Sequence, residues 1–196
     1  AEGYKIMHGE TDVTENYVIT PVAGTLEINA REVTVSVADK TVTYTGSEQS
    51  GNTEYTFSNV VDGQTATITY TPSKGTLPAT YDNGAYTANS FKVEDSNGTD
   101  VTSNYTLGTQ TAGKLTIENA SVAITITAAS DSKTYDGSAL TNATVTVTSG
   151  SLLAGDELVA TATGSATNVS DTAEGNNPIA EGYKIMHGET DVTENY

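Results

Sequence analysis

The sequence predicts an all-β protein made of tandem domains, and three observations support this prediction. Thr, Val and Tyr suit half-buried strands, and the abundant Gly, Asn and Asp suit the turns between strands. Apolar and polar residues alternate in short segments such as 33–37 and 122–126, which indicates strands with one buried face. Residues 1–17 recur letter for letter as residues 180–196, and such identity is typical of a tandem array.

A second, diverged repeat divides the chain further. Val13-Thr-Glu-Asn-Tyr17 returns as Val101-Thr-Ser-Asn-Tyr105 and as Val192-Thr-Glu-Asn-Tyr196, at spacings of 88 and 91 residues. A period of about 90 residues is a common domain size. We therefore predict C-terminal strands of a preceding copy in residues 1–28, a first β domain in 29–118, and a second in 119–196 that lacks its closing strand. We expect elongated domains, with an immunoglobulin-like sandwich or a β-grasp-like build, arranged as a rod.

The expected strands are separated by turn signals such as Asp62-Gly63, Asn83-Gly84 and Asn97-Gly98. In the first domain the strands are expected near 33–37, 41–45, 54–59, 65–71, 85–94, 101–107 and 114–118. In the second domain they are expected near 122–127, 143–148, 157–163, 179–186 and 190–196.

The connectors between domains are short. Four residues, none of them Gly or Pro, separate Ile28 from Val33 and Ile117 from Val122. Such connectors have less freedom than a Gly/Ser linker. We therefore expect stiff joints with a similar angle each time.

Residues 18–28 stand apart from any domain body. They correspond to the closing strand of a domain, with apolar residues at Val18, Ile19, Leu26 and Ile28. An unpaired strand and an open sheet edge tend to associate. Our hypothesis is that this segment completes the second domain of a neighbouring copy, either within one continuous chain or by strand exchange between molecules.

Charge excludes several classes of partner. The chain has 8 Lys and Arg against 25 Asp and Glu, a formal charge of −17. Nucleic acid and anionic membranes require cationic surface, so we expect neither as a partner. The apolar runs are too short for membrane insertion. The absence of Cys excludes a disulfide scaffold and any Cys-ligated metal.

Few residues suggest chemistry, and we expect no catalytic residue, no cofactor and no metal centre. His8 and His187 occupy the same repeat position and have no partner at ligand spacing, which favours a turn residue before Gly9 or Gly188. Asp95, Asn97 and Asp100 resemble the start of a calcium loop, but the bidentate Glu is absent. The Asn-Gly pair is a hairpin signal, so we favour a turn there.

Two further sets of residues have alternative interpretations. The recurring tyrosines are either an aromatic platform for sugars or core residues whose hydroxyls bond to backbone, and recurrence in every copy favours the core; they are Tyr17, Tyr44, Tyr105, Tyr135 and Tyr196. Lys40 with Asn104, and Lys133 with Asn195, have similar separations of 64 and 62 residues and are candidate pairs for an internal isopeptide crosslink, although such an Asn also suits a turn.

Several short motifs resemble the YDG/MBG-type repeats of large bacterial surface adhesins, whose pattern runs K-x-Y-D-G, G-D, N-Y, G-x-L-x-I. They are Lys133-Thr-Tyr-Asp-Gly137, Gly155-Asp156, Asn195-Tyr196 and Gly24-Thr-Leu-Glu-Ile28. The first domain matches less closely, because Lys40–Gly46 lacks the Asp, but Asn104-Tyr105 and Gly113–Ile117 keep the end of the pattern. The resemblance implies a secreted or cell-surface bacterial protein with many β domains in series and no catalytic residues.

The preferred function is therefore a non-catalytic stalk or spacer of a surface adhesin, whose partners are neighbouring repeat copies. Two alternatives remain open. One is a ligand-binding adhesin module for mucin-type glycans or another surface protein, in which many weak sites would give avidity. The other is a fibre-forming subunit completed by strand exchange between copies.

Overall fold

The computed structural model describes residues 3–196 and confirms the all-β class. Its sheets are small, with two or three strands each. The chain divides into two compact units, Ala1–Ala30 and Arg31–Tyr196. No helix within the described residues is long and apolar enough to cross a bilayer.

The smaller unit contains one hairpin and an extended segment. Its elements are β1 (Met7–His8), β2 (Thr11–Asp12) and the 3₁₀ turn η1 (Thr14–Asn16). Residues 18–30 follow without strand pairing in the structure.

The larger unit contains the elements of both predicted domains. Those of the first domain are β3 (Arg31–Ser36), β4 (Lys40–Thr43), β5 (Gln49–Ser50), β6 (Thr56–Ser58), β7 (Thr65–Thr67), β8 (Tyr70–Thr71), β9 (Lys74–Gly75), β10 (Ala79–Tyr81), β11 (Ala85–Tyr86), β12 (Lys92–Glu94), η2 (Thr102–Asn104), β13 (Tyr105–Thr111) and β14 (Leu115–Glu118). Those of the second are β15 (Thr125–Ala128), β16 (Val145–Ser149), β17 (Asp156–Val159), η3 (Val169–Asp171), β18 (Lys184–His187), β19 (Thr190–Asp191) and η4 (Thr193–Asn195).

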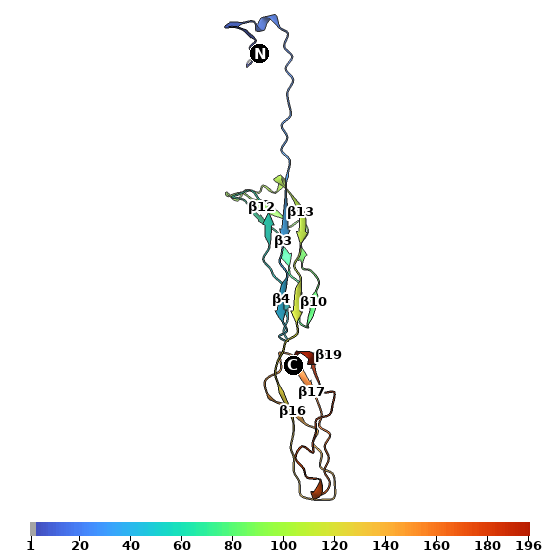
Figure 1. Ribbon diagram of the computed structural model, residues 1–196. Coiled ribbons are helices and arrows are strands. Elements are labelled where there is room, and N and C mark those ends of the chain that lie inside the picture. Colours follow the sequence, from blue (N-terminus) through green and yellow to red (C-terminus); the bar gives the residue numbers. More distant parts are fainter. Residues whose placement is uncertain (1–2) are drawn as a thin grey trace. The chain divides into compact units, whose positions relative to one another are not determined.

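Two parallel strand pairs close the first domain. The last strands, β13 and β14, pair in parallel with the first strands, β3 and β4, and β3 also pairs antiparallel with β6 (Figure 1). Parallel neighbours require a long crossover, which here is the whole middle of the domain. The domain is therefore complete only when its final strands have been added.

The antiparallel pair β3–β6 recurs in the second domain as β15–β16, with an offset of 91 residues at its first pair. Thr34 pairs with Ser58 in the first domain, and Thr125 pairs with Ser149 in the second. The sequence comparison matched Val33 with Val122, an offset of 89 residues, whereas the strand pairing gives an offset of 91. The connector into the second domain is therefore two residues longer than predicted. The shift preserves alternation because two residues are one strand period.

The recurring Val-Thr-x-Asn-Tyr motif folds the same way in all three copies. The backbone of Val13, Val101 and Val192 has φ between −121° and −113° and ψ of 17° or 18°. The Thr hydroxyl after each of them accepts a backbone N–H bond of 2.8 to 2.9 Å from a residue eight or nine positions earlier. Side-chain bonds of this kind compete with a strand ladder. Residues 102–104 and 193–195 are therefore 3₁₀ turns, where strands were predicted.

Burial separates the two identical copies of residues 1–17. Ile185 and Val192 are 1% and 3% exposed, whereas Ile6 and Val13 are only half-buried. Ile185 and Val192 belong to a core that also contains Tyr44, Leu115 and Ile117 of the first domain. A smaller core forms around Val33, Val93 and Tyr105. Identical local sequence therefore gives identical local structure but different packing.

The two copies provide a matched pair of substitutions. We expect Ile185→Ala to lower the free energy of unfolding by about 3 kcal/mol, because it empties a filled core position. Ile6→Ala, in the same sequence context, should lower it by less than about 1 kcal/mol. Denaturant unfolding of both variants measures the difference, and equal losses would contradict the burial described above.

Candidate functional site

The most elaborate site in the larger unit is the joint between the two domains. Beyond β4, Tyr44 and Gly46 of the first domain lie against the second domain. A Cβ atom on Gly46 would lie 2.1 Å from the carbonyl oxygen of Ala154, and Gly46 has φ of +74°. Only glycine therefore allows this approach of the two backbones without displacement.

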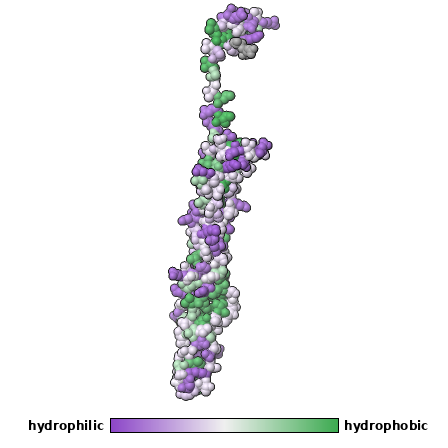
Figure 2. Space-filling model, turned by 180° about the vertical axis from the view of Figure 1, so that it is seen from behind, coloured by the Kyte–Doolittle hydropathy of each residue, from purple (hydrophilic) through white to green (hydrophobic). Residues whose placement is uncertain are grey.

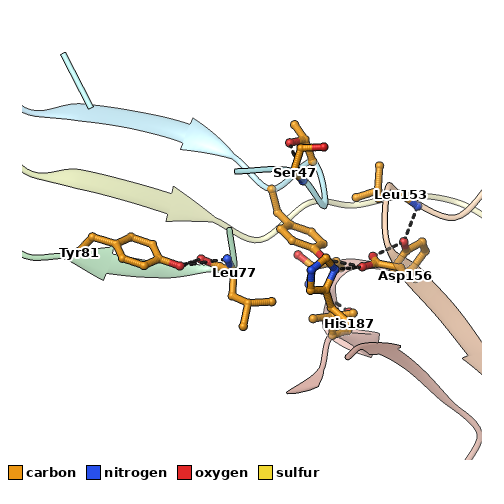
Figure 3. Close-up of polar contacts among 11 residues, drawn as sticks. Ser47, Leu77, Tyr81, Leu153, Asp156 and His187 are labelled. Atoms are coloured by element: carbon orange, nitrogen blue, oxygen red, sulfur yellow. Dashed lines mark hydrogen bonds and ion pairs between the residues drawn. The ribbon is translucent and has the colours of Figure 1, made fainter. Parts of the chain in front are cut away.

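A buried carboxylate lies at the centre of the joint. The Asp156 side chain has no exposed surface. The Tyr44 hydroxyl donates to Asp156 Oδ1 over 2.5 Å, and the Tyr196 hydroxyl donates to Oδ2 over 2.6 Å. His187 Nδ1 lies 2.8 Å from Oδ1, and Figure 3 shows the two side chains pointing toward each other. Three groups from three separate segments thus converge on one carboxylate.

The hydrogen bonds constrain the protonation of the tyrosines. Burial, and then the hydrogen bond to Asp156, raise the pKa of Tyr44 well above its ordinary value of 10. The same two causes raise the pKa of Tyr196 to about 12. Both hydroxyls therefore keep their protons and act as donors. His187 joins them as a donor when Nδ1 carries a proton.

The second layer of the joint is apolar and fixes the connector. Leu115, Ile117 and Ala120 lead into the joint and are 6% exposed or less. Asn195, which is 2% exposed, accepts the Ala120 N–H at its side-chain oxygen over 2.8 Å and donates its side-chain amide to Val192 O over 3.0 Å. The Asn195 carbonyl oxygen accepts the N–H of Val122 over 2.9 Å. The connector is thus part of a continuous core.

The joint brings together motifs that are far apart in the sequence. Tyr44-Thr-Gly46 comes from the first domain, and Gly155-Asp156 and Asn195-Tyr196 come from the second. The sequence showed these motifs as a recurring pattern but did not place them in one site. The feature that indicated a shared site was their repetition in a constant order.

Tyr105 and Tyr196 have hydroxyls bonded to backbone, as the core interpretation predicted, whereas Tyr44 is buried but its hydroxyl bonds to side chains. Tyr44 and Tyr196 line the joint, and the Tyr196 hydroxyl accepts the backbone N–H of Leu153 over 2.7 Å. Tyr105 makes the corresponding bonds in the first domain, from Val61 N–H over 3.2 Å and to Gln64 Oε1 over 2.6 Å. The other two lie differently, since Tyr17 and Tyr135 are 57% and 63% exposed.

The acidic loop lies in a turn, whereas the two histidines, predicted as turn residues, are the last strand residues before the turns at Gly9 and Gly188. His8 and His187 end the first strands of the β1–β2 and β18–β19 hairpins. The prediction missed the Asp156 partner of His187, because that residue is distant in sequence. Asp95 Oδ1 accepts the N–H groups of Asn97 and Thr99 over 2.8 and 2.9 Å.

Asp100 caps the next turn, since its Oδ1 accepts the Thr102 N–H over 2.9 Å. Within residues 3–196 no group of three or more His, Cys, Asp or Glu side chains is arranged to hold a metal ion.

The two predicted crosslink pairs have other partners. Lys40 Nζ donates to Ser50 O over 3.0 Å, and Lys133 Nζ donates to Asp136 over 2.9 Å. Asn195 is engaged in the connector as described, and Asn104 ends the turn η2. In the part of the chain that the structure describes, no hydrogen bond joins either lysine to its predicted asparagine.

The strand-completion residues lie outside the joint. Ile19 is half-buried, and Val18, Leu26 and Ile28 are 101%, 100% and 97% exposed. The side chains of Val18, Leu26 and Ile28 thus face solvent in the smaller unit.

The glycine contact at the joint can be tested with a matched control. Gly46 and Gly137 have φ of +74° and +77°, but a Cβ atom on Gly137 would meet nothing within 4 Å. We expect Gly137→Ala to lower the free energy of unfolding by about 1 kcal/mol, from its positive φ alone. Gly46→Ala should lose a further 1–3 kcal/mol or so through the clash with Ala154. Denaturant unfolding distinguishes the two, and equal losses would argue against close packing here.

The tyrosines predict an alkaline pH dependence. Because folding raises the pKa of each, their stabilisation is complete below pH 10; the contribution of Tyr196 is lost as the pH rises through about 12, and that of Tyr44 is lost at still higher pH. The free energy of unfolding should therefore fall between about pH 10 and pH 12. In the double variant Tyr44→Phe/Tyr196→Phe this fall should be much smaller. If both proteins lose the same stability over this range, the two hydroxyls are not responsible.

The chain was compared with known proteins in three ways. No family model matches it, and neither does any curated protein or any solved structure. The function is therefore argued from the geometry of the joint.

Proposed function

We propose that this chain is a non-catalytic structural repeat that serves as a stalk or spacer in a secreted or surface-anchored bacterial adhesin. The observation that carries the proposal is the joint, where a continuous core and a buried carboxylate connect consecutive domains. A protein that only needed to tether two domains would not require either feature. A protein that must hold successive domains in a constant relation requires both.

The joint resists bending because opening it would expose unfavourable groups. Moving the domains apart withdraws the Tyr44 hydroxyl from Asp156. A buried carboxylate that loses a donor is destabilised, since its charge is no longer compensated. Opening also exposes Leu115, Ile117 and Ile185, which are fully buried together.

Charge and motif resemblance support a surface location. A net charge of −17 makes neighbouring stalks repel one another and favours solubility. The ion pairs at the surface, such as Lys74–Glu48 and Lys184–Asp191, are exposed and contribute little to stability. Stability therefore depends on the cores and the joint. The resemblance to adhesin repeats supports the placement of such a stalk outside a bacterial cell.

Joint rigidity can be tested by comparing Tyr44→Ala with Tyr135→Ala. The two residues are equivalent, but Tyr44 is 2% exposed and Tyr135 is 63% exposed. The chain has no Cys, so spin labels can be attached to cysteines introduced at the exposed residues Thr106 and Thr146. Pulsed electron paramagnetic resonance should give one narrow distance distribution in the parent protein and in Tyr135→Ala, and a broad one in Tyr44→Ala.

The proposal fails if the parent protein already shows a broad distribution, since a freely hinged joint could not act as a stiff spacer. It also fails if Tyr44→Ala leaves the distribution narrow and unshifted. Circular dichroism of each variant verifies that both domains remain folded.

A further inference from the structure

The second domain has an open sheet edge beside β15. This strand pairs with β16 on one side, and within residues 3–196 no strand covers its other side. Its counterpart β3 lies between β6 and β13. The bond from Val122 N–H to Asn195 O, at 2.9 Å, is the only rung of a corresponding parallel ladder among the described residues. The uncovered side of β15 therefore has room for a parallel strand in line with the Val122 rung.

We propose that a second copy of this chain supplies this strand. Its hairpin, from Gly3 to Tyr17, takes the place of the identical residues 182–196, and its residues 18–28 continue as the closing strand along β15. The proposal builds on the equivalence of domains that underlies the proposed stalk, but it concerns association between molecules.

The two hairpins are interchangeable because they have the same conformation. Thr14 and Thr193 each donate to the Asp two residues earlier over 2.6 Å, and each accepts a backbone N–H over 2.9 Å. Exchange therefore preserves the contacts of the second domain. His8 and Tyr17 of the second copy would then approach Asp156 in place of His187 and Tyr196.

The first domain supplies the template for the register. There, Tyr105, Thr106 and Leu107 pair with Arg31, Glu32 and Val33. The equivalent pairs in the second domain join the incoming Tyr17, Val18 and Ile19 to Val122, Ala123 and Ile124, respectively. This register continues the rung that Val122 already makes.

The incoming segment suits this register in two respects. In a parallel ladder alternate residues of a strand direct their N–H groups to one neighbour. Starting from the Val122 rung, these residues are Val18, Thr20 and Val22, so Pro21, which has no N–H, faces away from β15. The incoming segment has six residues, 18–23, between Tyr17 and its Gly-x-Leu-x-Ile motif, whereas the first domain has seven, 106–112. The additional residue in the first domain coincides with the irregularity of β13 between Leu107 and Gln110, so the shorter segment can pair without it.

Apolar burial favours the association. Figure 2 shows hydrophobic side chains spaced along the thin segment of the smaller unit. Val18, Val22, Leu26 and Ile28 are 89% exposed or more. The equivalents of the last two, Leu115 and Ile117, are 0% and 2% exposed in the first domain. Strand addition would remove the same apolar surface from water.

The exchange joins copies head to tail. Each chain offers one donor segment and one acceptor edge, and these are different surfaces. Such a heterologous contact gives an open chain of copies when the rotation between them does not close, and a ring when it does.

Disulfide trapping tests the register directly. The double variant Val18→Cys/Ala123→Cys places two exposed cysteines opposite each other only in the proposed assembly. The control Val18→Cys/Thr125→Cys moves one cysteine by two residues, or about 6.6 Å, which is beyond disulfide reach. Mild oxidation in high salt, which screens repulsion between copies, should give a ladder of dimers and longer species on non-reducing gels, about tenfold more for Ala123→Cys than for the control.

Equal yields in the two variants would overturn the proposal, because random collision does not distinguish the two positions. A crosslink confined to single chains would overturn it as well. The distance measurement across the joint within one chain is independent of these results, so a stiff joint in a protein that forms no ladder would leave the stalk intact and reject the exchange.

Discussion

The buried carboxylate of Asp156 is the interaction on which the arrangement of the larger unit depends. A carboxyl group without exposed surface is tolerated only when hydrogen-bond partners surround it. Here the donors come from both domains, since Tyr44 precedes the connector and Tyr196 follows it. Neither domain alone can satisfy the carboxylate fully. The electrostatic requirement of one residue therefore becomes a geometric constraint on two domains.

The apolar core adds to this constraint. The larger of the two cores contains residues of the closing strand β14, the connector and the β18–β19 hairpin. A core that crosses a domain boundary couples the stability of the two domains. Domains joined by a flexible linker would have separate cores. Glycine at position 46 is part of the same design, because its missing side chain lets the backbones touch.

The parallel strand pairs explain why the repeat and the domain are out of step. The strands that complete a domain are the last to appear in its sequence, and they lie beside the first. The last strands of the domain thus lie beside its first strands, and the last strand leads directly into the next connector. The same topology leaves the closing segment separable from the rest of the domain, and the proposed strand exchange rests on this property.

Features that depend on neighbouring residues could be predicted from the sequence. Alternation predicted the positions of most strands, and the turns at Asn97-Gly98 and Gly9 form where their residues indicate. The Thr14, Thr102 and Thr193 turns also follow from local bonds, although their hydroxyls were not recognised as competitors of strand pairing. These features depend on neighbours within a few residues, which is why identical segments at the two ends adopt one conformation.

Tertiary structure alone decided which of these equivalent residues are buried and which meet. Tyr44 and Tyr135 have similar sequence surroundings, but only Tyr44 has a following domain against it within the described residues. Ile6 and Ile185 differ in the same way. The two-residue shift of β15 and the convergence of Tyr44, Asp156, His187 and Tyr196 arise from long-range pairing and packing. The sequence determined the parts and their local shapes, whereas burial and partnership depend on contacts between segments far apart in the chain, and no local pattern encodes those.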